Sequence, residues 1–501
     1  MFFDYNREIL MNDFRDRLSE VILPIYAKVL WWFLVILAEY HILWNLLQYV
    51  IWDLHYNIYE KRLGLLLIAA GTLYLILSAA ADPPRLKKTV SIWKKTLSFE
   101  QIILITLFFW YILVCVIRGN IDGRPCLKHN DNRLFIQWCS TFVLFPFSRL
   151  IGMRRARKTI EGMFHIAAAI YTPICLWALT KFLRAEEVIL LSGKAIAANE
   201  DGALMIGGHQ NITGAASAVM LAISIHMIMM KRKWIRLLYT AAAIVHAVVV
   251  ILTNSRTSFI ATAFLLLAIL IVLNWDRIES LRKAVTKDKS KALHIAAGIA
   301  ICIVLVFLLL YIRKWIMMMS AGAMDKTDTM KARDFTDLNG RNWIWRVSFM
   351  IMFNSKENFF FGVTPAYVSS ALYKSGLIYS AIKQPHAHNL LLQVGLSLGV
   401  PAMIVYAVFL VSVIRRCIRI IREKAVLRED GRVPKLWDIA IIVLFLLVFE
   451  ITEVMTFAVN RFNLPVFFIL AGWITAYDLR IHGNGSYRKG MGGLRNRVLG
   501  K

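Results

Sequence analysis

Residues 386–410 read HAHNLLLQVGLSLGVPAMIVYAVFL, so two histidines and an asparagine stand directly before a long apolar run. The run has the length of a helix that crosses a bilayer, which needs about 20 apolar residues. Histidine is the side chain best suited to proton transfer near neutral pH. A pair of imidazoles at the mouth of a membrane span therefore favours a membrane-embedded transferase over a pore or a soluble enzyme.

The rest of the chain shares this apolar character. Of its 501 residues, 58% are hydrophobic, and the mean hydropathy is +0.58. A soluble domain is about 45–50% apolar. We therefore predict an all-α, polytopic membrane protein with about twelve transmembrane helices. The expected spans are 29–51, 63–81, 101–118, 134–151, 162–183, 211–230, 235–253, 257–274, 293–313, 388–414, 437–456 and 464–480.

The distribution of basic residues predicts which way the chain faces. The net charge is +27, and Lys and Arg gather in short clusters within alternate connections between the expected spans. That pattern is typical of cytoplasmic loops and argues against a nucleic-acid partner. We therefore expect the cytoplasmic (inner) membrane, with both termini cytoplasmic. The basic connections are 82–100, 149–161, 231–236, 277–291 and 415–435.

The same reasoning divides the chain into segments. Residues 1–28 form a cytoplasmic N-terminal segment, 29–313 hold the first nine helices, and 387–480 hold the last three. Residues 314–386 form a large extracytoplasmic loop, and 481–501 a basic cytoplasmic tail. Loops this long are usually functional or disordered. The aromatic residues and helix-forming stretches of this loop predict that it folds.

Several familiar chemistries have no motif here. The chain has no Asp-x-Asp, no P-loop and no Gly-x-Ser-x-Gly, and its six cysteines form no Cys-x-x-Cys pair. We therefore expect no metal, no cofactor and no disulfide framework.

Four polar motifs are expected at the outer face, although they lie far apart in the sequence. They are Gly207–Asn211, Asn254–Thr257, Gly340–Trp345 and His386–Asn389.

Arg256 is the cation that stands out in these motifs. It lies where a helix is expected to start, with Asn254 and Ser255 available as caps. Helix N-termini favour anions, and a guanidinium adds a planar fork suited to phosphate oxygens. The alternative is an interfacial arginine that reaches the lipid headgroups. For Arg341 alone, an ordinary exposed loop arginine is the alternative.

The two histidines are also expected at a helix start. The helix dipole and nearby arginines favour a neutral ring that accepts a proton. Because His386 and His388 are two residues apart, they would face different ways on a regular helix, so one is expected to act. The alternative is a pair of interfacial histidines.

Two carboxylates are expected inside the membrane. Glu450 and Glu453 share a face of the expected span 437–456 at i, i+3. Such groups mark ion pathways or pair with arginines at helix ends, and we favour the second interpretation.

At these motifs the chain resembles the bacterial O-antigen ligase and polysaccharide polymerase superfamily. Gly207–Asn211 is similar to the family's His-Pro-Asn segment, with Gln210 at the proline position. Asn254–Thr257 resembles its Ser-Arg helix start, and Gly340–Trp345 its Gly-Arg segment. His386–Asn389 is the strongest match.

The resemblance implies a GT-C-like, metal-independent, inverting glycosyltransferase that uses a glycan on undecaprenyl diphosphate. Arg256 and Arg341 would bind the diphosphate, and His388 would deprotonate the acceptor, with His386 as the second catalytic candidate. The matching residues expected to bind substrate are His209, Asn211 and Asn389.

The acceptor is left open by the sequence. A second lipid-linked glycan, lipid A-core and a protein side chain all fit the shared motifs, and we favour the polymerase because nothing in the chain reveals an outer-membrane acceptor. Membrane lipids surround each of these enzymes. The alternative from another class is a lipid-linked oligosaccharide flippase, but the inverted repeats common in transporters are not evident.

Cysteine labelling tests the predicted topology. On a background without native cysteines, a membrane-impermeant reagent added outside should modify a cysteine at Ser369 and spare one at Ser290. The charge asymmetry is the physical reason. The reverse labelling pattern would place the four motifs on the cytoplasmic side and contradict the prediction.

Overall fold

The computed structural model describes most of the residues that carry the four motifs. The described residues are scattered positions in 21–36, then 98–121, 144–145, 153–184, 188–189, 195–198, 203–206, 210–230, 233–274, 341–374, 386–423, 436–454 and 463–482. The helices among them are α5 (Phe99–Ile121), α8 (Met153–Leu183), α9 (Gln210–Met230), α10 (Lys233–Leu252), α11 (Arg256–Leu273), α14 (Arg341–Phe353), α15 (Lys356–Phe361), the 3-10 helix η2 (Pro365–Tyr367), α16 (Val368–Lys374), α17 (Leu390–Leu398), α18 (Val400–Glu423), α19 (Trp437–Thr452) and α20 (Asn463–His482).

Five described helices are long and apolar enough to cross a membrane. They are Phe99–Gly119, Ala156–Leu183, Gln210–Met230, Trp234–Leu252 and Arg256–Leu273. They coincide with expected spans, and α19 and α20 fall at two others, so a helical membrane protein is confirmed. The expected spans 29–51, 63–81, 134–151 and 293–313 lie wholly or mostly outside the described residues, so the total of twelve stays a prediction.

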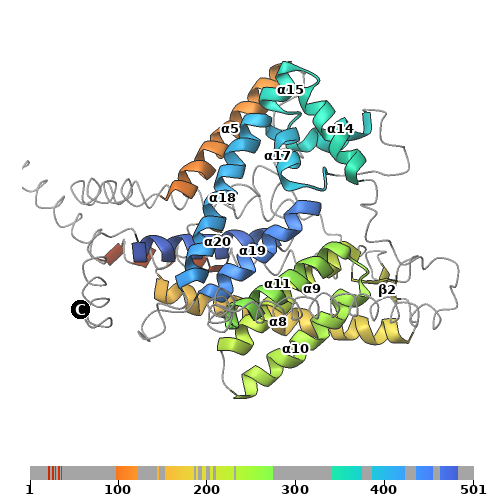
Figure 1. Cartoon of the computed structure of the whole chain (residues 1–501), viewed down its shortest axis with the longest axis vertical. Helices are drawn as coiled ribbons and strands as arrows, with labels where there is room; N and C mark the ends of the chain where they lie inside the picture. The colour runs from red at the N-terminus through yellow and green to blue at the C-terminus, as the bar shows by residue number, and fades with distance from the viewer. Residues whose placement is uncertain are drawn as a thin grey trace, which may run out of the picture.

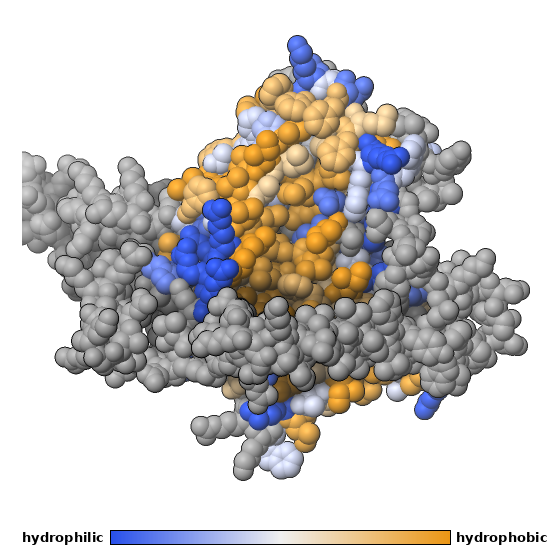
Figure 2. Space-filling model, in the orientation of Figure 1, coloured by the Kyte–Doolittle hydropathy of each residue, from blue (hydrophilic) through white to orange (hydrophobic). Residues whose placement is uncertain are grey.

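The helices form two packed groups that meet at α19 (Figure 1). In one, α18 packs against α5, α17 and α20; in the other, α9 packs against α10 and α11, and α19 contacts both α18 and α11. The face seen in Figure 2 is hydrophobic over the region where α5 and α18 lie, with hydrophilic residues towards both ends. That distribution suits a helix bundle whose outer surface meets lipid.

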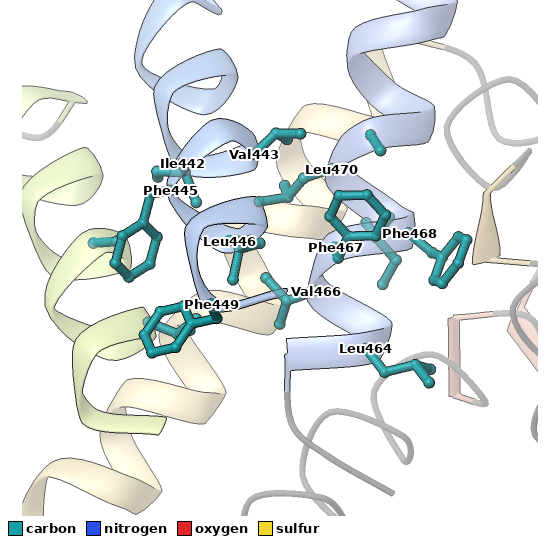
Figure 3. Packing of buried hydrophobic residues seen from close by; sticks show 14 of the residues in the cluster. Ile442, Val443, Phe445, Leu446, Phe449, Leu464, Val466, Phe467, Phe468 and Leu470 are labelled. Carbon is teal, nitrogen blue, oxygen red and sulfur yellow. The ribbon is translucent and has the colours of Figure 1, made fainter. Parts of the chain in front are cut away.

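The core is centred on α19 and α20. These helices are apolar almost all round because neighbours cover them on several sides. Phe445 and Phe449 lie one turn apart on α19, while Val466 and Phe467 face that helix from α20 (Figure 3). This packing holds the last turn of α19 in place.

A buried ion-pair network joins three helices near the end of α18. Arg416 Nε donates to Glu100 Oε1 at 2.6 Å, and Arg416 also bonds Asp478 of α20. Both carboxylates are buried, so the guanidinium supplies the charge that burial requires. The network ties α5 and α20 to α18.

Within the helical fold, segment 184–210 contains one short sheet that was not predicted from the sequence. Three short strands form an antiparallel sheet in the order β1-β2-β3: β1 (Val188–Ile189), β2 (Ala195–Ala198) and β3 (Leu204–Met205). Ala197 pairs with Met205, and Ile189 with Ala195. The ladder satisfies backbone groups of a segment packed on α8 and α9.

The expected span 388–414 is wrong as a single helix, because α17 ends at Leu398 and α18 begins at Val400. Gly399 between them has φ 87°, and a Cβ there would lie 2.2 Å from the Phe360 carbonyl oxygen. Trp110 Nε1 donates to the Leu398 carbonyl at 2.8 Å. Glycine is therefore required at the break.

The described part of the long loop is folded, as predicted, and is docked on α17. Helices α14 and α16 share a small apolar core with α17, in which Val347, Val368, Leu372 and Leu396 are buried. Backbone pairing strengthens the docking, since Val363 N donates to the Leu396 carbonyl at 2.7 Å. This places the start of α14 near the start of α17.

Replacing Gly399 with alanine should destabilise the protein. The positive φ alone costs about 1–2 kcal/mol for an L-residue, and the clash with Phe360 adds to it. We expect the thermal unfolding midpoint of the purified protein to fall. Gly162→Ala is the matched control, because a Cβ at Gly162 meets nothing within 4 Å. Equal midpoints for both variants would contradict this account.

Candidate active site

The segment His386–Asn389 lies immediately before α17, where Asn389 is the N-cap. The Asn389 side chain accepts from Leu392 N at 3.1 Å and donates to the Ile451 carbonyl at 3.0 Å. One amide thus caps α17 and joins it to the end of α19. These contacts give Asn389 a structural role; its predicted contact with substrate stays a prediction.

The two imidazoles lie together, with ring centroids 4.2 Å apart. The expectation that they face different ways is wrong because neither is on the helix. His388 has φ 52°, and its backbone N–H donates to His386 Nδ1 at 3.2 Å. His386 is buried, whereas the His388 side chain keeps 15% of its surface exposed.

Glu453, which directly follows α19, receives contacts from three separate elements. Its Oε1 accepts from Arg341 Nη2 at 2.5 Å and from Asn211 Nδ2 at 3.1 Å. Its Oε2 lies 3.1 Å from His388 Nδ1. The Glu453 side chain is only 3% exposed, so these partners replace the water that an ionised carboxylate would otherwise need. Three of the four motifs therefore meet at one carboxylate.

The fourth motif lies against the first turns of α9. A Cβ on Gly214 would come within 2.6 Å of Ser258 Oγ and 2.8 Å of Thr253 Oγ1, so the turn before α11 packs closely on α9. Ser255 caps α11 by accepting from Ser258 N at 3.4 Å, as predicted. Arg256 is the first residue of α11. Helix α11 packs on α9, whose Asn211 bonds Glu453.

Sequence reasoning identified part of the role of Glu453. Arg341 is the first residue of α14, so the interpretation of this carboxylate as a partner for a helix-end arginine is confirmed. The contacts with His388 and Asn211 were not predicted. Its position at the end of an expected span was the available signal. His209 and Gly340 lie outside the described residues, so the role expected of His209 stays a prediction.

The cluster also has a donor set that metals use. Ligand atoms of His386, His388 and Glu453 lie within 4.8 Å of one another. The Arg341 guanidinium already lies against Glu453 and supplies positive charge there. The expectation that the site works without a metal stays a prediction.

The fold and site define a helical membrane protein with an arginine–carboxylate–histidine cluster at the ends of α9, α14, α17 and α19. A family model described as O-antigen ligase matches residues 241–407, a segment that contains Arg256, Arg341 and both histidines. The resemblance inferred from the motifs is thereby confirmed, and the chain is O-antigen ligase-like over this segment. No curated protein matches the chain.

Proposed function

We propose that the protein is a membrane glycosyltransferase that transfers or polymerises glycans from an undecaprenyl-diphosphate donor at the outer face of the cytoplasmic membrane. The observation that carries the proposal is the meeting of Arg341, His388 and Asn211 at Glu453, in a chain of O-antigen ligase type. A cation and a base side by side are what transfer from a diphosphate to a hydroxyl requires.

The arginines act on the leaving group. As the bond between the anomeric carbon and the diphosphate oxygen breaks, the electron pair leaves with the diphosphate. Fixed cations aimed at this developing charge are usually the largest catalytic contribution. Arg341 starts α14 and Arg256 starts α11, so each guanidinium is accompanied by the N-terminal end of a helix dipole. These two cations would perform the reaction without a metal.

His388 acts on the acceptor. Its ring accepts the hydroxyl proton while the hydroxyl oxygen attacks the anomeric carbon opposite the diphosphate, which inverts that centre. Its partial exposure leaves the ring reachable by an acceptor, in contrast to buried His386. Asn211, His209 and Asn389 remain the candidate substrate contacts, and Asn211 lies beside Glu453.

The acceptor we favour is a second lipid-linked glycan, which would make the protein a polymerase of cell-surface polysaccharide. Lipid A-core or a protein side chain would make it a ligase or a protein glycosyltransferase. The family match is to ligases rather than to transporters, and no described feature favours the flippase alternative.

Removing the base should abolish transfer. His388→Ala is expected to lose about a hundred- to ten-thousand-fold in turnover, the usual effect of removing a general base, and His386→Ala should lose less. The assay is transfer by the purified protein from lipid-linked glycan extracted from producing cells, with EDTA present. Full activity of His388→Ala would refute the role of His388 as the general base. Loss of wild-type activity in EDTA would point to a metal.

Keeping the charge but changing the geometry of Arg256 should also impair transfer. We expect Arg256→Lys to lose most of its turnover because an ammonium cannot bind two phosphate oxygens with a planar fork. The measurement is glycan chain production at matched expression, with Lys158→Arg as the control for a Lys/Arg exchange elsewhere. Near-normal glycan production by Arg256→Lys would contradict the proposed role of Arg256 in binding the diphosphate.

A further inference from the structure

The three groups around Glu453 all present hydrogen-bond donors to it. Arg341 and Asn211 bond to Oε1, while His388 bonds to Oε2. An ionised carboxylate accepts and cannot donate, so the hydrogen shared with His388 must reside on Nδ1 of the ring. In the neutral ring, Nε2 then carries the lone pair.

The neighbouring histidine has the opposite arrangement. His386 Nδ1 accepts the backbone N–H of His388, so this nitrogen carries no hydrogen. The proton of a neutral His386 therefore lies on Nε2. Two rings 4.2 Å apart thus differ in their chemistry: His388 offers a basic Nε2, and His386 offers an N–H. The contact with Glu453 sets the tautomer of His388, and the backbone N–H of His388 sets that of His386.

Glu453 also restrains the backbone and the cation. His388 has a positive φ, a conformation that non-glycine residues keep only where their surroundings hold it. The hydrogen bond between the His388 ring and Glu453, which directly follows α19, holds His388 in that backbone conformation. Oε1 of the same carboxylate holds Arg341 at the start of α14.

We propose that Glu453 is the positioning residue of this site. It fixes the tautomer of His388 so that Nε2 receives the acceptor's proton, and it holds Arg341 beside that ring to meet the diphosphate. This inference rests on the proposed transferase function. Because Arg341 has five N–H donors and contacts Glu453 through Nη2, the guanidinium is able to bind phosphate oxygens while it remains paired.

The sharpest variant is Glu453→Gln, which has nearly the same shape but one acceptor and one donor in place of two acceptors. If the glutamine oxygen faces Arg341 and Asn211, its NH₂ faces His388 Nδ1 and selects the tautomer with hydrogen on Nε2. If the amide has the flipped orientation, its NH₂ faces the donors of Arg341 and Asn211. Neither orientation preserves the site.

The test measures turnover and donor binding separately on the purified full-length protein. Glu453→Gln should lose about a hundred- to ten-thousand-fold in kcat, as when a catalytic histidine is held in the wrong tautomer. Its Kd for undecaprenyl diphosphate should stay within about threefold of wild type, since the arginines remain. Glu453→Asp, which keeps both acceptor oxygens and the charge, should retain more turnover than Glu453→Gln.

Glu450→Gln is the matched control, because Glu450 is another buried carboxylate and lies in the last turn of α19, three residues before Glu453. It should keep kcat within about threefold. A Glu453→Gln protein that folds and turns over normally would overturn the positioning role, as would equal loss in both glutamine variants. If Glu453→Gln does not fold, Glu453→Asp is measured in its place. The proposal then requires that its kcat fall while its Kd for undecaprenyl diphosphate stays within about threefold of wild type.

The outcomes separate this inference from the function on which it rests. Failure of wild type to transfer glycan would defeat the proposed function itself. Transfer by wild type, loss in His388→Ala and normal turnover in Glu453→Gln would defeat the positioning role alone.

Discussion

A buried carboxylate has to be paired, and the part of the molecule around the site is arranged to meet that need at Glu453. Removing one partner from a buried ion pair typically costs about 3–5 kcal/mol, because the remaining charge is left without water. The partners of Glu453 come from α9, α14 and the segment before α17. Each of these elements is in turn fixed by apolar packing, so the electrostatic requirement and the hydrophobic core support the same geometry.

The scaffold that delivers these partners depends on a broken helix. If α17 and α18 were continuous, residue 399 would have ordinary helical dihedrals, and the close contact with the Phe360 carbonyl would be lost. The break lets α15 and the following backbone pack against α17 while α18 continues towards the Arg416 network. Arg341 reaches Glu453 because the loop helices are held at this position.

Local signals predicted much of this structure. The Asn254–Ser255–Arg256 stretch gave the correct start of α11, because capping depends on neighbours in the chain. Apolar length predicted the positions of α5, α8, α9 and α10 for the same reason. The motifs that resemble those of the family include Arg341, His388 and Asn211, which meet at Glu453. The family match covers three of the four motifs.

The remaining features depend on contacts that are distant in the sequence. The chain shows a glycine at 399, but only the packed Phe360 carbonyl explains why glycine is needed. Glu450 and Glu453 are equivalent by spacing on the expected span 437–456, and only the fold shows that Glu453 lies against Arg341 and His388. The short strands of segment 188–205 have too few residues to produce a periodic signal.

The pairing of Glu453 also has a consequence for biosynthesis. Glu453 is separated from Asn211 by 242 residues, from Arg341 by 112 and from His388 by 65, and it follows all three in the chain. During translation, the guanidinium and the imidazole are made and inserted before their counter-charge exists. The cluster therefore assembles only after the ribosome has completed α19, so a nascent chain truncated before that helix contains the motifs but lacks the carboxylate that brings them together.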